Sequence, residues 1–214
     1  MRARRGSLTW TVAPLLSALE SPVAQGAEER APELIYEVRL DMDGDGKMDR
    51  AMLMLVNATG EKDTSPLVKD RYFARKNDRI DLHIHLGVGE ARIDPSRAPD
   101  FVKRAVVDPA ETPFIEPIDS KGRSLVINAV YGWGASVSWG ETLTIVRRGG
   151  RFLAAGFTKS WYNRSAEGRC DLNFLSGKGV LTEGARKRPV KGRFKPVPVE
   201  EWSRTIHAKA CSES

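Results

Sequence analysis

The sequence lacks several features that would assign it at once to a large class of proteins. After residue 26 it holds no apolar run long enough to cross a bilayer as a helix, so we expect no transmembrane span. It holds no internal repeat, which argues against a propeller or a solenoid. It also lacks the G-x-S-x-G motif of a serine nucleophile, because the nearest stretch, GASVSWG (134–140), misses the pattern.

Cysteine is scarce as well. The chain has 2 cysteines, Cys170 and Cys211, and this even count favours one disulfide in an oxidising compartment. The bridge would close a loop of about 40 residues and stabilise the fold by roughly 4 kcal/mol. Two unpaired thiols in a reducing cell are the alternative. If the pair is bridged, no cysteine remains to act as a nucleophile.

The composition is ordinary for one globular domain. An apolar fraction of 41% and a charged fraction of 29% in 214 residues supply enough core for a single domain and argue against disorder. The net charge of +6 is mild and identifies no partner.

The first residues have the arrangement of a secretory signal. A basic head precedes a short apolar run, Leu8–Leu19, and the small residues Ala24 and Gly26 follow where a signal peptidase needs them. We therefore predict a cleaved signal peptide at residues 1–26, a single β-rich domain at 27–214, and a periplasmic or secreted location. A disordered cytoplasmic tail is the alternative, because a proline and a glutamate make the run less apolar than most signals.

Strand-like patterns dominate from Leu34 onward. RIDLHIHL (79–86) alternates apolar and polar residues, and Gly149 and Gly150 mark a two-residue hairpin. Successive hairpins with almost no helical periodicity predict a mainly β fold, an antiparallel sandwich or barrel-like sheet with few short helices. The predicted strands are 34–40, 51–56, 79–86, 101–107, 124–131, 141–148, 151–162, 170–175 and 180–183.

The segment 186–199 combines 3 prolines with 6 basic residues, a composition typical of an extended edge or loop. The charge protects such an edge from aggregation, or contacts phosphate, a polyanionic glycan or lipid. We expect no nucleic-acid partner, because no aromatic residues interleave with the basic ones to stack on bases. A short helix is expected near the C-terminus.

The stretch DMDGDGKMD (41–49) crowds four aspartates into nine residues. Asp41, Asp43 and Asp45 stand at alternate positions, so their side chains can converge on one hard cation. The spacing matches the first nine positions of an EF-hand loop, with the Lys47 carbonyl seventh and Asp49 ninth. We therefore predict a metal site formed by Asp41, Asp43, Asp45, Lys47 and Asp49.

The stretch departs from an EF-hand at the twelfth position, where Met52 replaces the bidentate glutamate, and its flanks are strand-like. In this it resembles the calcium loops of FG-GAP and VCBS-type repeats, over residues 41–55. The resemblance implies Ca²⁺, but no propeller, since only one copy is present. We expect a structural ion with a weak affinity of about 10⁻⁴ to 10⁻³ M. A turn without an ion is the alternative, although four carboxylates repel one another.

The longer stretch 141–179 resembles a family of small exported bacterial proteins of no assigned activity. That resemblance implies export and a β fold, and it supplies no function.

The segment YGWGASVSWG (131–140) is a candidate binding surface. Tyr131, Trp133 and Trp139 stand among glycines, and exposed aromatic rings there would offer contact area to an unknown protein or glycan of the cell envelope. Cross-strand aromatic packing at a hairpin end is the alternative.

Of the 3 histidines, His83 and His85 share one face of a predicted strand, as zinc ligands can. The solvated side of an amphipathic strand is the stronger explanation for them, because the spacing nominates neither a third ligand nor a general base. We therefore predict an exported, calcium-stabilised β domain that binds an envelope component. A metal-dependent hydrolase acting on envelope material is the alternative, and a purely structural envelope protein is a third possibility.

Overall fold

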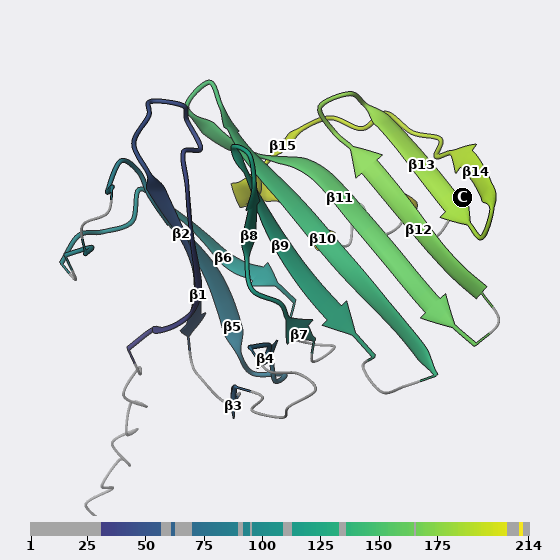
Figure 1. The fold of residues 1–214 in the computed structure, drawn as a ribbon, viewed down its shortest axis with the longest axis horizontal. Helices are drawn as coiled ribbons and strands as arrows, with labels where there is room; N and C mark the ends of the chain where they lie inside the picture. Colours follow the sequence, from purple (N-terminus) through teal and green to yellow (C-terminus); the bar gives the residue numbers. More distant parts are fainter. Residues whose placement is uncertain are drawn as a thin grey trace, which may run out of the picture.

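The computed structural model describes residues 31–56, 61–62, 70–89, 92–94, 96–108, 113–132, 136–164, 166–204 and 210–211. The predicted signal at residues 1–26 lies outside this part of the chain, as do Trp133 and His207. The described residues form two antiparallel sheets (Figure 1).

The smaller sheet has four strands in the order β1-β2-β5-β6. They are β1 (Glu33–Leu40), β2 (Asp49–Val56), β5 (Arg79–His85) and β6 (Phe101–Val107). β1 and β2 form the predicted hairpin around the acidic turn, with Leu40 opposite Asp49. Alternate residues point to the core, so Leu53 of β2 and Leu82 of β5, which are register partners, are both 0% exposed.

The larger sheet runs in the order β14-β13-β12-β11-β10-β9-β7-β4-β3, with β15 beside β11 and β8 beside β9. The hairpin between β10 and β11 turns at Gly149 and Gly150, whose φ values of 56° and 76° suit glycine. The strands are β3 (Glu61–Lys62), β4 (Tyr72–Phe73), β7 (Phe114–Ile115), β8 (Asp119–Lys121), β9 (Ser124–Tyr131), β10 (Val137–Arg148), β11 (Arg151–Asn163), β12 (Ala166–Asn173), β13 (Lys178–Glu183), β14 (Arg186–Pro189) and β15 (Val197–Pro198).

The predicted fold class is confirmed. Every described strand pair is antiparallel, and the sheets do not close into a barrel, so the sandwich is the alternative that the structure supports. β14 ends the larger sheet with all four of its residues exposed, which confirms the edge expected from its prolines and charges.

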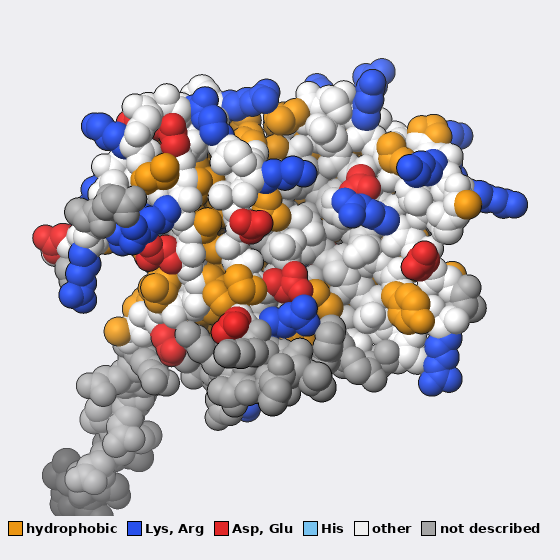
Figure 2. Space-filling view, in the orientation of Figure 1, with side chains coloured by type: hydrophobic (Ala, Val, Ile, Leu, Met, Phe, Trp, Pro, Cys, Tyr) orange, Lys and Arg blue, Asp and Glu red, His pale blue; other side chains and the backbone are white. Residues whose placement is uncertain are grey.

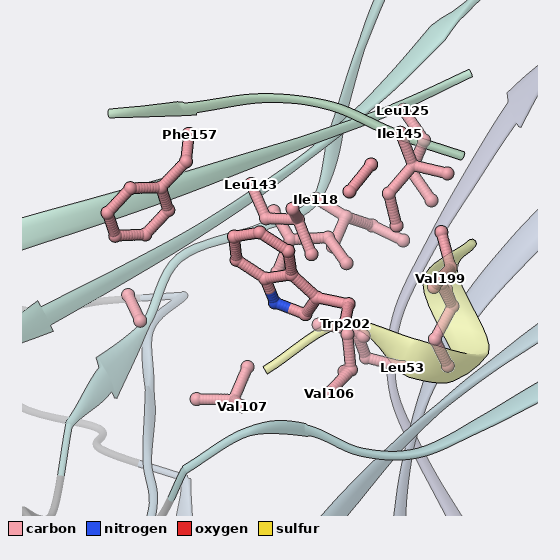
Figure 3. Close-up of a cluster of buried hydrophobic side chains, with 14 of the residues drawn as sticks. Leu53, Val106, Val107, Ile118, Leu125, Leu143, Ile145, Phe157, Val199 and Trp202 are labelled. Carbon is pink, nitrogen blue, oxygen red and sulfur yellow. The ribbon is translucent and has the colours of Figure 1, made fainter. Parts of the chain in front are cut away.

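Apolar side chains from both sheets meet in one core. Trp202, 6% exposed, lies at the centre of this cluster (Figure 3). It follows the 3-10 turn η2 (Val199–Glu201). The labelled neighbours in Figure 3 are Leu53, Val106, Val107, Ile118, Leu125, Leu143, Ile145, Phe157 and Val199.

The C-terminal segment is fastened to both sheets. Lys103 of β6 donates through Nζ to the carbonyl oxygens of Glu200 and Trp202, both at 3.0 Å. The predicted disulfide is present, and it joins Cys170 of β12 to Cys211 with a Cα–Cα distance of 5.7 Å. A bridge here is compatible with an oxidising compartment. Within the described ranges, no helix has the length and apolar character to span a membrane.

Candidate functional site

The acidic turn gathers three of its four carboxylates. One oxygen each from Asp41, Asp43 and Asp49 lies within 4.8 Å of the others. Met42 is 1% exposed and belongs to the core, whereas Asp41 and Asp43 on either side of it are partly exposed. The turn is thus anchored by an apolar side chain and presents oxygen atoms outward.

Asp49 is the buried member of this group, with 0% exposure. Its two carboxylate oxygens accept the backbone N–H groups of Met42 and Gly87, each at 2.8 Å, and so tie the turn to the end of β5. Burial raises the pKa of Asp49, and the charges of Asp43 and Asp41 raise it further against those two hydrogen bonds. A cation beside these carboxylates would stabilise the ionised form of Asp49 and lower its pKa.

The carboxylate of Asp45, a predicted ligand, does not belong to this group. The Asp45 carboxylate is exposed, and its Oδ1 accepts the backbone N–H of Lys47 at 2.8 Å. The side-chain oxygens that the structure brings together are therefore those of Asp41, Asp43 and Asp49.

Positive charge reaches the turn from the larger sheet. Arg147 of β10 donates from Nη1 to Asp43 Oδ2 at 2.7 Å, with both side chains about four-fifths buried at 23% and 19% exposure. The Arg123 guanidinium occupies the place that a Cβ on Gly44 would take, and the φ of 77° at Gly44 also suits glycine. Sequence reasoning missed both arginines, because they lie far along the chain.

The donor set fits a hard cation. Each carboxylate oxygen has a second lone pair beyond the one used by its N–H donor, and three carboxylates are the ligands that Ca²⁺ and Mg²⁺ prefer. The residues that would hold such an ion are Asp41, Asp43 and Asp49. Arg147 competes for Asp43, so an ion there would share that carboxylate with a guanidinium.

His85 is not on a solvated face, and this corrects the sequence-based interpretation for that residue, whereas His83 is partly exposed. His85 is only 3% exposed. The segment after β5 folds back, because the Asp100 N–H donates to the Ile84 carbonyl and Arg97 donates to the Leu86 carbonyl, each at 2.9 Å. Burial lowers the pKa of His85, and the nearby Arg97 lowers it further. In the described part of the chain, neither histidine belongs to a group of three possible metal ligands.

Of the predicted aromatic surface, Tyr131 is buried, whereas Trp139 is partly exposed and lines a pocket together with Val137 and Trp161. Tyr131 is 1% exposed and stacks on Trp139, with ring centroids 5.4 Å apart and planes 8° apart. Trp161 is the next register partner in this row, so cross-strand packing accounts for Tyr131 and Trp139. Trp133 lies outside the described residues.

A groove of about 400 Å³ lies on the opposite, outer face of the larger sheet. Residues such as Phe157 and Cys170 point to the core, so their strand neighbours point outward. The surface over β10 and β11 in Figure 2 is mostly neither hydrophobic nor charged. The outward side chains that line the groove are Val130, Ser138, Ser160, Tyr162, Glu167, Arg169 and Thr182.

The polar side chains beside this groove are held in place. Arg169 donates through Nε to both oxygens of Asp171, at 2.9 and 2.8 Å, and Thr158 donates to the same carboxylate at 2.7 Å. Burial would raise the pKa of Asp171, but these hydrogen bonds keep the pKa below its ordinary value, so the carboxylate stays ionised. No sequence motif marks the groove, because its lining comes from five strands, β9 to β13, and each of them contributes at most three residues.

Comparison with family models, curated proteins and solved structures found no match for this chain.

Proposed function

We propose that this chain is an exported β domain, stabilised by Ca²⁺ and a disulfide, that binds a component of the cell envelope. The observation that carries the proposal is the groove on the outer sheet face, where positioned polar side chains and an exposed ring surround a volume of about 400 Å³. Volumes of about 300 to 1,000 Å³ are typical of ligand sites. The disulfide supports a location in an oxidising compartment.

Filling the groove tests this function. Purified exported chain should co-sediment with envelope material, and Ser160→Trp should abolish that co-sedimentation, because an indole on the exposed Ser160 would occupy the groove. Ser176→Trp is the matched control, since Ser176 is also exposed but lies in the turn between β12 and β13. Retention of binding in Ser160→Trp, or no binding by the wild type, would contradict the proposal.

The calcium ion in this proposal has a bracing role, with Asp41, Asp43 and Asp49 as its side-chain ligands. Millimolar Ca²⁺ should then raise the melting temperature of the wild type and leave that of Asp41→Asn unchanged. Asp45→Asn distinguishes the two possible sets of ligands. The melting temperature of this variant should still rise with Ca²⁺ if only Asp41, Asp43 and Asp49 bind the ion. It should not rise if Asp45 is also a ligand. A wild type that melts at the same temperature in Ca²⁺ and in EDTA would refute the ion.

A further inference from the structure

We infer that the ligand of the outer groove is a neutral oligosaccharide, stacked on Tyr162 and hydrogen-bonded by Arg169 and Ser160. This inference rests on the proposed function and adds the class of ligand.

The shape of the face suits an extended ligand. A second hollow of about 280 Å³ adjoins the groove on the same face and is lined by Thr144, Thr158 and Asn173 among others. The register places Thr158 opposite Asp171 and Ser160 opposite Arg169, so the two hollows occupy neighbouring rows of the sheet. Two hollows in line accommodate a chain of linked rings better than one small molecule.

The chemistry of the groove matches a sugar ring, which has an apolar C–H face and a rim of hydroxyl groups. Tyr162 is 58% exposed and offers a ring face for the C–H groups. Hydroxyl groups need donors and acceptors together, and Ser160 supplies both. The hydrogen bonds from Arg169 Nε to Asp171 fix that guanidinium, so its remaining N–H groups are oriented before the ligand arrives.

The charges on this face select a neutral ligand. Of the charged residues that line the two hollows, Arg169 is a cation and Glu167 and Asp171 are carboxylates, so the lining has no excess of positive charge to attract a polyanion. A polyanion would instead be drawn to the edge segment 186–195, whose six basic residues are all exposed. A neutral, hydroxyl-rich chain is the occupant that the groove favours.

Isothermal titration calorimetry of the full exported chain tests this, with neutral oligosaccharides released from the same envelope material as the probe. The wild type should bind. Tyr162→Ala should weaken binding about tenfold or more, as truncating a stacked aromatic anchor does, whereas Tyr162→Phe keeps the ring and should stay within about threefold. Arg169→Ala should weaken binding by a similar factor, and Arg186→Ala, an exposed arginine of the β14 edge, should bind like the wild type.

The outcomes separate the two proposals. Binding to envelope material that the neutral oligosaccharides do not displace overturns the inference and leaves the proposed function standing. Absence of binding to either overturns both. Equal losses in Tyr162→Phe and Tyr162→Ala contradict ring stacking. Preferential binding of an acidic glycan such as alginate, unaffected by Tyr162→Ala, also overturns the inference, because it places the ligand at the basic edge. Circular dichroism and melting curves of each variant exclude loss of fold as the cause.

Discussion

The substitution Arg147→Met tests whether the negative charge of the acidic turn is neutralised by a side chain, by Ca²⁺, or by both. The substitution keeps most of the apolar stem of Arg147 and removes the hydrogen bond of 2.7 Å to Asp43. A hydrogen bond to a charged group is worth about 1.5–3 kcal/mol, and a fully exposed ion pair about 0–1 kcal/mol. The side chains of Arg147 and Asp43 are 23% and 19% exposed, so their interaction lies between these two cases. We therefore expect Arg147→Met to lower the free energy of unfolding by about 1–2 kcal/mol in the absence of calcium.

Calcium should compensate for the missing guanidinium. At 10 mM Ca²⁺ and a dissociation constant of about 1 mM, binding to the native state adds about 1.4 kcal/mol. In Arg147→Met the competing cation is gone, so the gain from Ca²⁺ should exceed the gain in the wild type. Urea unfolding of both proteins in EDTA and in 10 mM Ca²⁺ measures the four free energies of unfolding.

The neighbouring Arg148 provides the control, because it is exposed and Arg148→Met removes the same charge from the same strand. Arg148→Met should lower stability by less than about 0.5 kcal/mol, as surface changes usually do. Equal calcium gains in wild type and Arg147→Met would show that the ion and the guanidinium do not share Asp43. An unchanged stability of Arg147→Met in EDTA would refute the role of the ion pair itself.

Two further predictions concern buried groups. Asp49→Ala leaves two backbone N–H groups without their acceptor and should lower the free energy of unfolding, measured in urea, by about 2–5 kcal/mol. Asp49→Asn keeps one acceptor oxygen and should lower it by less. Equal losses in the two variants would contradict this account. Burial and Arg97 hold the pKa of His85 below its ordinary value of 6.5. The unfolded chain therefore takes up this proton first as the pH falls. The contribution of His85 to the free energy of unfolding should be intact above about pH 6.5 and should decrease below it. His85→Gln should reduce that fall between pH 7 and pH 5, and an unaltered pH dependence would contradict the assignment.

The strands were predictable where their pattern is local. β9 runs from Ser124 to Tyr131, the predicted range, because apolar and polar residues alternate along it. β10 begins at Val137, four residues before the predicted start, since Trp139 and Gly140 resemble a loop in sequence. Gly140 is nevertheless paired on both sides, opposite Val130 and Ser160. Pairing with neighbours on both sides overrides the weak local preference of a glycine.

The surroundings of each site were not predictable, because they depend on residues distant in the chain. From its sequence alone, the acidic turn is expected to be destabilised by repulsion between its carboxylates. In the structure, Arg147 binds Asp43 across a separation of 104 residues. Alternation in β5 correctly places His85 on the face away from Leu82, but it does not reveal that the segment around Arg97 covers that face. A period of two reports which side a residue faces, not what packs there.

The acidic turn and the groove belong to opposite ends of β10, and this constrains how calcium can affect binding. Arg147 stands near the end of β10, and Gly140, which lines the groove, stands near its start, seven residues apart, which corresponds to roughly 24 Å along a strand. The second hollow reaches Thr144 on the outer face, whereas Arg147 points to the inner face, where it lies over the ring of Phe152. Coupling between two ligands requires an element that both of them bias. Within this interval β10 is paired to β11 on one side and, as far as Ile145, to β9 on the other. EDTA should therefore lower the melting temperature while leaving the affinity for envelope oligosaccharides at 25 °C unchanged within about twofold. The same calorimetry should be done with Arg147→Met and the wild type. A larger change in affinity on calcium removal would mean that the conformation of the acidic turn is coupled to that of the groove through β10.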